Sequence, residues 1–563
     1  MARTGLWQAG PVLGFDRATA LGQLASQEFD VLVIGGGITG AGVALDAASR
    51  GLRTALVERR DFASGTSSKS SKLVHGGLRY LQQREIRLVY ESLAERQRLL
   101  ENAPHLVSQL PFLIPLFGRN GVAQRAVVRS FATALWLYDL TGGWRIGSRH
   151  RRVGRAEALE HHPLLRADNL VSGFLYYDAR ADDARLTLAV LRTAALEYGA
   201  VVANYAQVGR LLAKTGRVIG AAVRPVRGSG LPTTPEDEIE VRAHAVVNAT
   251  GVWADDVRAL DDAPHRTLRP AKGVHVTVPA ASLPCDIAAV IPVRGDRRSI
   301  FVIPWPDCAM TYVGTTDTAY DGPLDDPACT ADDVDYLLSA VNGATSAGLT
   351  RADVTGVWAG LRPLLAPANA RLSERTADLS RRHSVETSPS GLVTVTGGKL
   401  TTYRKMAEDA VDEVVRLLRS ANRIGSALPS STKRLRLRGA CAPTQEQLCA
   451  YGTEAATVLA VADGRPELLE PVVEGLPFIG AEVVYAARAE MAQTVADVLE
   501  RRTRALLQHA HKSMLAAPAV ARLLAPELGW ADGQADAEVE SFINSAQAQL
   551  ELAGLPSPSR DRR

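Results

Sequence analysis

Three glycines and a later carboxylate have the types and the spacing of a dinucleotide-binding turn: Gly35, Gly37, Gly40 and Glu58. The first two glycines permit a tight turn and close approach of the backbone to a pyrophosphate, and Gly40 permits close packing of a helix on a strand. That helix would present free N–H groups and its positive dipole end to the phosphates. Glu58 is placed to accept hydrogen bonds from ribose hydroxyls and to repel a 2′-phosphate, which disfavours NADP. The pattern predicts a dinucleotide site.

Three later segments carry polar groups that suit the rest of such a ligand. Gly65–Lys72 supplies hydroxyls and backbone donors, and Ala249–Gly251 offers a second glycine approach. Gly397–Tyr403 leads into a helical pattern, whose N-terminus would stabilise negative charge on a reduced flavin. Because contacts spread this widely suit FAD better than NAD, we predict FAD. The further predicted cofactor contacts are Thr66, Ser67, Ser70, Ser71, Lys72, His75, Gly76, Ala249, Thr250, Gly251, Gly398, Lys399, Leu400, Thr401 and Thr402.

Runs of aliphatic and β-branched residues predict the strands that must position these groups. From Asp30 to about Leu418 they alternate with helical patterns, as in α/β proteins. After a small, polar stretch at 426–432, the spacing of Ala, Leu and Val predicts helices over 446–459, 482–499 and 502–515. We expect a loosely docked leader (1–29), interleaved cofactor and substrate domains (30–425), a helical domain (426–555) and a disordered tail (556–563).

Composition narrows the classes of function. A net charge of +3 over 563 residues does not indicate nucleic-acid binding. The N-terminus lacks the apolar core of a signal peptide, and no run predicts a spanning helix. The five cysteines have no CxxC spacing, and the histidines at 161–162 and at 509 and 511 lack supporting ligands. We therefore expect no disulfide framework and no metal site, in a reducing cytoplasm.

Several longer motifs stand out in the chain. They are Ser67–Tyr80 (SSKSSKLVHGGLRY), Ala271–Val276 (AKGVHV), Val313–Asp317 (VGTTD), Gly360–Leu364 (GLRPL) and Gly397–Arg404 (GGKLTTYR). These motifs resemble those of the FAD-dependent glycerol-3-phosphate dehydrogenases, and the resemblance runs from about Asp30 to Arg404 and less tightly through residues 490–504. It implies a Rossmann-like βαβ FAD domain interleaved with an antiparallel-sheet substrate domain, and a mainly helical C-terminal cap domain.

The resemblance also implies a reaction. Members oxidise sn-glycerol 3-phosphate to dihydroxyacetone phosphate by hydride transfer from C2 to flavin N5, and pass the electrons to membrane quinone or, in related oxidases, to oxygen. The phosphate would be bound by Arg79, Arg362 and Arg381, with Tyr80 as a hydroxyl donor and Arg382 as an alternative to Arg381. The catalytic candidates are His275 as the base, Lys399 and Arg362.

Each candidate also has a structural interpretation. His275 could be a satisfied core histidine, Lys399 could be solvent-exposed at a helix start, and the arginines could form salt bridges. We expect His75 to position the flavin rather than to transfer a proton. The region of Thr315–Asp317 is equally consistent with a turn or a helix cap.

Quinone lies in the bilayer, so a membrane-facing surface is expected. Ala132–Leu140 is apolar and aromatic, and the arginines at 145, 149, 151, 152 and 155 follow it, a combination that favours peripheral attachment to the inner face of the plasma membrane. A buried helix with a solvated basic loop is the alternative, and the helix with Arg416, Arg419 and Arg423 is a second candidate surface. A homodimer is among the assemblies that the sequence allows.

Two other functions compete with this hypothesis. An amino-acid or amine oxidase of the same fold would need a carboxylate clamp but not several phosphate-binding arginines. A non-catalytic flavin-binding scaffold would not need so many candidate catalytic residues. Both alternatives are disfavoured by the motifs around Arg79 and Arg362.

Overall fold

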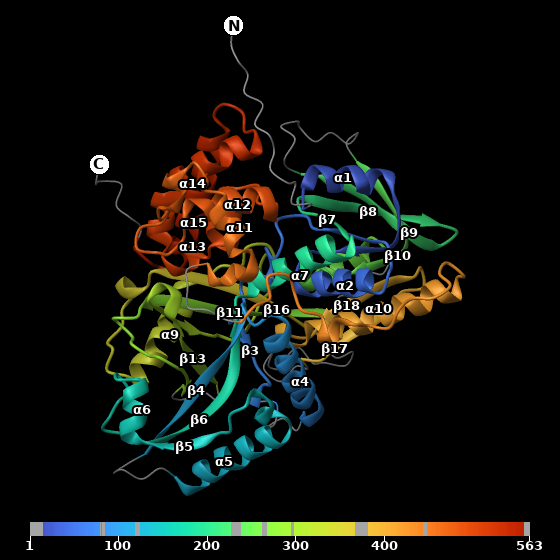
Figure 1. Ribbon diagram of the computed structural model, residues 1–563. Helices are drawn as coiled ribbons and strands as arrows, with labels where there is room; N and C mark the ends of the chain where they lie inside the picture. The colour runs from blue at the N-terminus through green and yellow to red at the C-terminus, as the bar shows by residue number, and fades with distance from the viewer. Residues whose placement is uncertain are drawn as a thin grey trace.

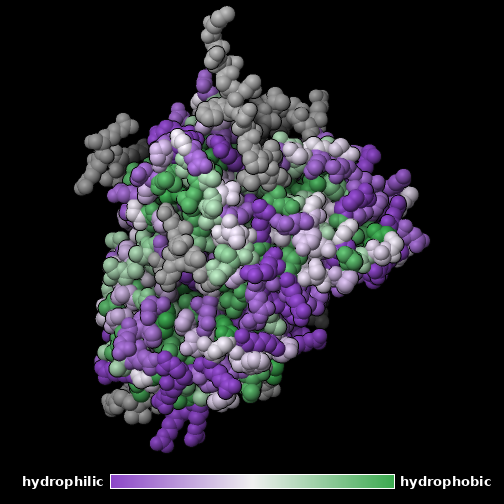
Figure 2. Space-filling view, in the orientation of Figure 1, coloured by the Kyte–Doolittle hydropathy of each residue, from purple (hydrophilic) through white to green (hydrophobic). Residues whose placement is uncertain are grey.

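The computed structural model describes residues 15–78, 80, 85–118, 124–226, 238–261, 267–293, 298–365, 381–442 and 448–556. Figure 1 shows two sheets side by side, with a group of C-terminal helices above one of them. Figure 2 shows the molecule in the same orientation, with hydrophobic residues interspersed among hydrophilic ones, including at the lower end of the molecule. Arg79 and all but the first residue of the predicted tail at 556–563 lie outside the described residues.

A mainly parallel sheet, sheet A, forms the centre of the cofactor-binding half. Its strands are β1 (Glu28–Ile34), β2 (Thr54–Val57), β7 (Val201–Ala203), β8 (Ala206–Lys214), β9 (Arg217–Pro225), β10 (Ile239–Asn248), β17 (His383–Thr387) and β18 (Leu392–Gly397). The parallel order is β18-β10-β1-β2-β7, and β17 and the hairpin β8–β9 add antiparallel pairs. Since helices cover one face and the hairpin part of the other, Phe29–Ile34 of β1 are all buried.

Three helices pack on one face of sheet A, namely α2 (Ile38–Ser49), α7 (Asp183–Tyr198) and α10 (Tyr403–Ser420). Small residues allow them to approach closely. Gly42 of α2 lies against Tyr403, where a Cβ atom would be 2.8 Å from the ring. The predicted βαβ unit therefore forms as β1–α2–β2, and α10 starts beside it although it is more than 350 residues away in sequence.

A ten-stranded, mostly antiparallel sheet, sheet B, forms the other half. Its order is β15-β11-β14-β13-β12-β4-β6-β3, with β16 on β11 and β5 on β6. Strands of the two sheets alternate along the chain, which confirms the predicted interleaved fold. The strands are β3 (Leu73–Val74), β4 (Val107–Phe117), β5 (Arg151–Gly154), β6 (Leu170–Ala181), β11 (Leu268–Pro279), β12 (Ala288–Pro292), β13 (Ser299–Trp305), β14 (Met310–Gly314), β15 (Thr318–Ala319) and β16 (Gly356–Leu365).

Helices on the outer side of sheet B share its aromatic core. They are α4 (Ile86–Asn102) and α5 (Arg125–Leu140), followed by the 3₁₀ turn η2 (Gly143–Ile146). Leu93 of α4 and Tyr138 of α5 are buried beside Phe112 and Tyr176 of the sheet. One side of α5 is thus anchored, while its other side faces outward.

The C-terminal helices form the cap that lies above sheet B in Figure 1. They are α12 (Gly480–Glu490), α13 (Ala505–Gln508), α14 (Ala510–Leu528) and α15 (Gln534–Leu552). Val483, Met514 and Phe542 of the cap belong to the same apolar cluster as Val276 and Val302 of sheet B. The cap core is therefore continuous with the core of the substrate half.

The predicted loosely docked leader is wrong for residues 15–29. Helix α1 (Arg17–Ser26) begins at Asp16, whose side chain accepts a 2.7 Å hydrogen bond from the Thr19 amide, and packs against β7 and β10. Leu24 is fully buried, and the Arg17 guanidinium donates to the carbonyl oxygens of Asn204 and Tyr205. Burial of these groups docks the segment on sheet A.

The continuous helices predicted over 482–499 and 502–515 are also wrong, because the chain breaks each of them. Helix α12 stops at Met491 (φ 55°), and a π-helical turn, η12, follows at Asp497–Arg502. Arg504 (φ 68°) and the extended His509 then separate η12, α13 and α14. The Asp497 carboxylate accepts from the amides of Gln493 and Thr494, so it stabilises a turn where apolar spacing alone indicates a helix.

Candidate active site

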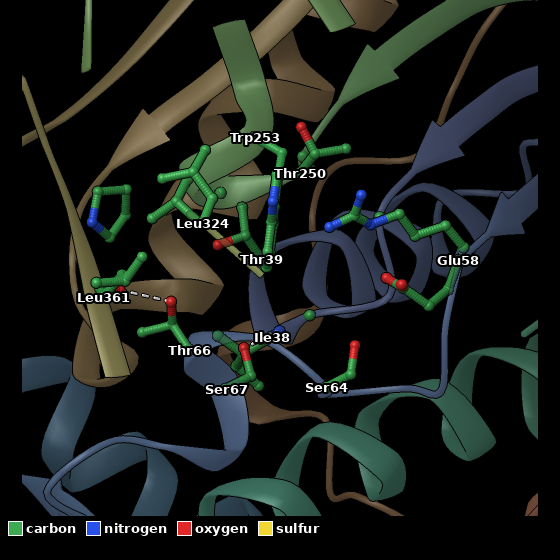
Figure 3. Close-up of a pocket in the computed structure, with 18 of the residues that line it drawn as sticks. Ile38, Thr39, Glu58, Ser64, Thr66, Ser67, Thr250, Trp253, Leu324 and Leu361 are labelled. Atoms are coloured by element: carbon green, nitrogen blue, oxygen red, sulfur yellow. Dashed lines mark hydrogen bonds between the residues drawn. The ribbon is translucent and has the colours of Figure 1, made fainter. Parts of the chain in front are cut away.

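A cavity of about 460 Å³ opens at the carboxyl ends of β1, β2, β10 and β18. Ligands of open α/β sheets bind at this edge, where loops leave the parallel strands. In Figure 3, Thr66 and Ser67 lie on one side of the cavity, Thr250 and Trp253 on the opposite side, and Glu58 at one end. The dashed line in this view is the hydrogen bond from the Thr66 hydroxyl to the Leu361 carbonyl oxygen. This bond joins the cofactor loop to sheet B.

The glycine turn has the geometry that the sequence predicts. Gly35 has φ 111°, and a Cβ atom there would be 2.8 Å from the carbonyl oxygen of Ala249. Gly40 lies beneath the turn, where a Cβ atom would overlap the Gly35 carbonyl oxygen. The first N–H of α2, that of Ile38, donates to the Ser67 hydroxyl oxygen at 2.9 Å. These contacts bring α2 and the Ser67 loop together at one point of the cavity.

Glu58 ends β2 and faces the cavity. Its carboxylate accepts the amide of Gly36 at 2.7 Å and the amide of Arg60 at 2.9 Å. Burial raises the pKa of this carboxyl, while the two amides act in the opposite direction. The side chain is therefore held in one orientation at the end of the cavity, with oxygen lone pairs left for a ligand hydroxyl.

Sequence reasoning missed several residues of the cavity wall. The Arg59 guanidinium lies 4.6 Å from the centre of the Trp253 ring, and Arg60 forms a 2.9 Å ion pair with Asp326. Arg59 also pairs with Asp325, so two carboxylates of one loop meet two arginines of another. Of these residues, only Trp253 could have been found from the sequence, because it ends the segment Val246–Trp253, which includes the predicted contacts Ala249–Gly251. The other missed wall residues include Thr39, Lys69, Leu324, Pro327, Leu361 and Met406.

Most of the predicted cofactor residues line the cavity. They are Gly35, Gly37, Glu58, Thr66, Ser67, Ser70, Ala249, Thr250, Gly251, Gly398, Lys399 and Leu400. Gly40, Ser71, Lys72, His75, Gly76, Thr401 and Thr402 are not part of its wall.

Lys72 departs furthest from the prediction. Its ammonium lies 3.3 Å from both the Asp183 carboxylate and the Ser68 carbonyl oxygen, in a buried position away from the cavity. Thr401 instead exchanges hydrogen bonds with the backbone of His75, and the Gly76 amide donates to the Tyr138 hydroxyl. These residues support the wall from behind.

One face of sheet B carries the catalytic candidates. In the antiparallel register of β11 and β16, His275 is opposite Trp358, Gly273 is opposite Gly360, and Ala271 is opposite Arg362. Directly opposed residues share a face, so His275 and Arg362 flank a pair of glycines. A Cβ atom at Gly273 would overlap the Arg362 guanidinium. The glycines thus allow the Arg362 guanidinium and the Lys69 backbone to lie directly against this face, next to the cavity wall at Gly360.

His275 is a buried imidazole with an unusual environment. Its ring stacks on Trp358 at 4.7 Å, its Nε2 lies 2.9 Å from the Ser71 hydroxyl, and its Nδ1 has no hydrogen-bond partner among the described residues. Burial, and then the charges of Lys72 and Arg362, lower its pKa well below the ordinary value. The ring is therefore neutral at pH 7 and is not part of the cavity wall in this conformation.

Two of the predicted phosphate ligands share one carboxylate. Arg362 and Arg381 each approach Asp317 at 3.4 Å, one on each carboxylate oxygen. Arg362 also donates to the Thr315 hydroxyl at 3.0 Å and to the carbonyl oxygen of Thr316. The alternative clamp, Arg382, instead points to Glu85 at 2.5 Å and is exposed. The structure therefore brings Arg381, and not Arg382, beside Arg362.

Lys399 adds a third cation next to this pair. Its ammonium donates to the Ser92 hydroxyl at 2.7 Å and lies 4.3 Å from the centre of the Tyr80 ring. Burial, with a contribution from the charge of Arg381, lowers its pKa to about 7, while Glu91 and Asp178 act in the opposite direction. Burial likewise lowers the pKa of His75 to about 4, with Lys399 and Arg381 acting in the same direction and Asp178 against it. Tyr80, His75, Lys399 and Arg381 therefore lie in one region, together with the carboxylate of Asp178.

The residues of the cavity fit FAD. Its volume lies in the range of cofactor sites, roughly 300–1,000 Å³. The glycine turn, the start of α2 and Glu58 can hold the nucleotide. Gly35 packs against the Ala249 backbone, and Gly40 against the Gly35 carbonyl oxygen, more closely than a Cβ atom would allow, as a tight dinucleotide-binding turn requires. The polar loops at Thr66–Ser70 and Gly398–Leu400 remain for the rest of the group.

Comparison with known proteins agrees with this fit. The family model described as FAD dependent oxidoreductase matches residues 30–404, and the model described as the C-terminal domain of alpha-glycerophosphate oxidase matches residues 430–535. Glycerol-3-phosphate dehydrogenase 2 of Mycobacterium tuberculosis is 42% identical, over 97% of this chain and 92% of that protein. The chain belongs to the FAD-dependent glycerol-3-phosphate dehydrogenases.

Two further members extend the likeness. The mitochondrial glycerol-3-phosphate dehydrogenase of Bos taurus is 38% identical over 92% of this chain and 73% of its own length. The crystal structure of the glycerol-3-phosphate dehydrogenase from Bacillus halodurans complexed with FAD is 32% identical, with a TM-score of 0.74 over 97% of this chain and 99% of that one. The family's cap is thus included in the match.

Proposed function

We propose that this dehydrogenase oxidises sn-glycerol 3-phosphate to dihydroxyacetone phosphate, with FAD as the hydride acceptor and membrane quinone as the final electron acceptor. The observation that carries the proposal is that Arg362 and Arg381 share one carboxylate, Asp317, and that the charge of Arg381 also acts on Lys399. Such cations suit a phosphate dianion, and the planar guanidinium fork suits its oxygens.

The phosphate would lie between the two arginines, with Tyr80 as a hydroxyl donor and Arg79 as a further cation. Arg362 is already oriented by Thr315 and the Thr316 carbonyl oxygen, so little side-chain freedom is lost when an anion binds. A phosphate at this position would place the carbon chain near the cavity wall at Gly360 and Leu361.

We assign the C2 hydroxyl proton to His275. A neutral imidazole can accept a proton, and the burial that lowers its pKa excludes competing water. Lys399 would orient the substrate oxygen or stabilise the anionic reduced cofactor from the cavity wall. FAD supplies the hydride acceptor when it is bound. The predicted cofactor residues that line the cavity would hold FAD. The residues behind them would support the wall, namely Ser71, Lys72, His75, Gly76, Thr401 and Thr402.

The test is anaerobic reduction of the purified holoenzyme. The flavin absorbance near ~450 nm should bleach with sn-glycerol 3-phosphate and stay unchanged with glycerol, glycine or sarcosine. Bleaching by glycine or sarcosine would favour an amine oxidase, and no bleaching by any of them would reject the proposal. A second assay compares a short-chain quinone with oxygen. Stoichiometric hydrogen peroxide would assign oxygen as the acceptor instead of quinone.

We propose that α5 and its surroundings attach the enzyme to the inner face of the plasma membrane. Among the described residues, no helix is both long enough and apolar enough to cross a bilayer. The outward side of α5 exposes Trp136, Leu137 and Leu140, and Trp144 of η2 is 56% exposed. Tyr90 of α4 joins this surface through Arg145, whose guanidinium lies 4.8 Å from its ring centre.

Several arginines follow α5 in the chain, namely Arg149, Arg151, Arg152 and Arg155. Apolar side chains combined with such cations suit an anionic lipid surface, and Figure 2 shows hydrophobic and hydrophilic residues together at the lower end of the molecule. Co-sedimentation with phosphatidylglycerol vesicles should exceed that with phosphatidylcholine vesicles. The double variant Trp136→Glu, Leu140→Glu should stay in the supernatant, whereas Leu515→Glu, at a cap residue that is 79% exposed, should sediment normally.

A further inference from the structure

Three arginines of the cap reach into the cofactor half of the enzyme. They are Arg501, Arg502 and Arg504, which follow one another at the end of η12 and before α13. Arg502 and Arg504 are each 2% exposed in their side chains, and Arg501 is 9% exposed. Guanidinium groups are rarely buried to this extent unless each is paired. Their partners therefore indicate what the segment does.

Arg501 and Arg502 meet at one carboxylate, that of Asp61. Arg501 donates to it at 2.6 Å, and Arg502 donates to both of its oxygens, at 2.7 and 2.9 Å. Burial raises the pKa of Asp61, but the charges of Arg502 and Arg501 outweigh it and lower the pKa to about 2. Asp61 belongs to loop 58–65, which contributes Glu58, among others, to the cavity wall.

Arg504 acts on the next loop, residues 66–72. Its guanidinium donates to the Ser68 carbonyl oxygen at 3.0 Å and pairs with the fully buried Asp183. Asp183 in turn accepts the Ser70 amide at 3.1 Å and the Ser70 hydroxyl at 2.6 Å. Ser70 lines the cavity, and the adjacent Ser71 hydroxyl contacts His275. One cap side chain is thus two contacts away from the cofactor wall at Ser70 and, through the adjacent Ser71, three contacts away from the candidate base.

The backbone of the cap is arranged for these contacts. Arg504 has a left-handed conformation (φ 68°), which an L-residue adopts at a cost, and it interrupts what the apolar pattern predicts as helix. Lys72, at the end of the loop that Arg504 holds, also has positive φ (56°) and shares Asp183. Strained backbone on both sides of one ion cluster is maintained only where surrounding contacts determine it.

We propose that the segment Arg501–Arg504 of the cap positions loops 58–65 and 66–72 for FAD, with Asp61 and Asp183 as the intermediaries. Arg502 and Arg504 are then positioning residues. The cap shapes the cofactor site through these two loops, although none of its described residues lines the cavity. The inference rests on the assignment of FAD to this cavity.

The test replaces three equally buried arginines by lysine, which keeps the charge but loses the fork. Arg502→Lys and Arg504→Lys should raise the Kd of the deflavinated enzyme for FAD at least tenfold and alter the visible spectrum of the bound flavin. Arg192→Lys is the matched control, because Arg192 is 3% exposed and joins α7 to Glu454 and Tyr485 of the C-terminal part without contacting either loop. It should lower the Tm but leave the Kd within twofold.

An unchanged Kd and spectrum in both Arg502→Lys and Arg504→Lys would overturn the inference, whatever their Tm. If a lysine variant does not fold, Asp61→Asn tests the same contact from the loop side, with the same expected rise in Kd. Gly40→Val separates the two hypotheses, because its side chain would overlap the Gly35 carbonyl oxygen. Tight FAD binding by Gly40→Val would reject the cavity assignment, whereas weak binding beside normal arginine variants would reject the inference alone.

Discussion

The enzyme contains two groups of arginines that differ in burial and in how closely carboxylates pair with them. The cap arginines at 501, 502 and 504 are buried and meet Asp61, Asp183 and Asp497, with bonds as short as 2.6 Å. Arg362 and Arg381 share the single carboxylate of Asp317 at 3.4 Å, and their side chains are 23% and 14% exposed. Among the described residues, the first group meets three carboxylates, whereas the second shares one. Pairing, rather than residue type, separates a structural arginine from one that can bind an anion.

The largest expected effect is on the first group. Asp61→Ala removes the carboxylate and leaves Arg501 and Arg502 buried without it, so the free energy of unfolding should fall by about 3–5 kcal/mol. Urea unfolding of the deflavinated enzyme measures this change. Asp335→Ala, which breaks an exposed pair with Arg351, should lower the free energy of unfolding far less, because water screens an exposed ion pair. Equal losses in the two variants would remove the distinction between the groups.

The second effect concerns activity rather than stability. Arg362→Ala should lower kcat/KM for sn-glycerol 3-phosphate by roughly 30- to 1,000-fold, the loss expected when a hydrogen-bonded charge pair is removed, about 2–4 kcal/mol. Its Tm should change less than that of Asp61→Ala, because the Arg362 side chain is partly exposed and its ion pair with Asp317 is long, at 3.4 Å. Steady-state kinetics and a thermal melt check both parts. A large fall in Tm with normal kinetics would place Arg362 in the structural group.

A smaller effect distinguishes two neighbouring arginines. Arg381→Ala should lower kcat/KM roughly tenfold, since it removes one charged contact to the phosphate, about 1–2 kcal/mol. Arg382→Ala should leave kcat/KM unchanged, because its guanidinium faces Glu85 on the surface. The same kinetic assay applied to both variants decides which residue belongs to the site. The reverse result would exchange their roles.

The smallest effect is the pH dependence that Lys399 gives to stability. Burial lowers its pKa from 10.5 to about 7, so between these pH values the unfolded chain binds more protons than the folded chain. The free energy of unfolding therefore rises with pH in this window, by at most about 1.4 kcal/mol per pH unit from this group. Lys399→Met should remove that part of the slope in urea titrations of the deflavinated enzyme at pH 7.5 and 8.5. Identical slopes would show that the ammonium is not desolvated.

Local motifs made part of the site predictable. Gly35, Gly40 and Glu58 lie within one βαβ unit, and their geometry follows from glycine backbone freedom and from the short connection between two parallel strands. The family resemblance extended this to FAD and to the motifs around Arg362 and Lys399. The contacts of loop 66–72 were harder to predict, because residues of one polar run face different ways. Ser70 lines the cavity, while Lys72 is buried against Asp183.

By itself, the sequence determined the βαβ cofactor turn, the interleaved α/β fold and the family, because each depends on patterns within short stretches of chain. Only the tertiary structure decided which carboxylates each arginine meets. Asp317 reaches both Arg362 and Arg381, and Asp61 reaches Arg501 and Arg502 some 440 residues further along the chain. Such pairs depend on strand register and on docking of the cap, and free energy then follows from burial and distance. No local pattern encodes these two quantities.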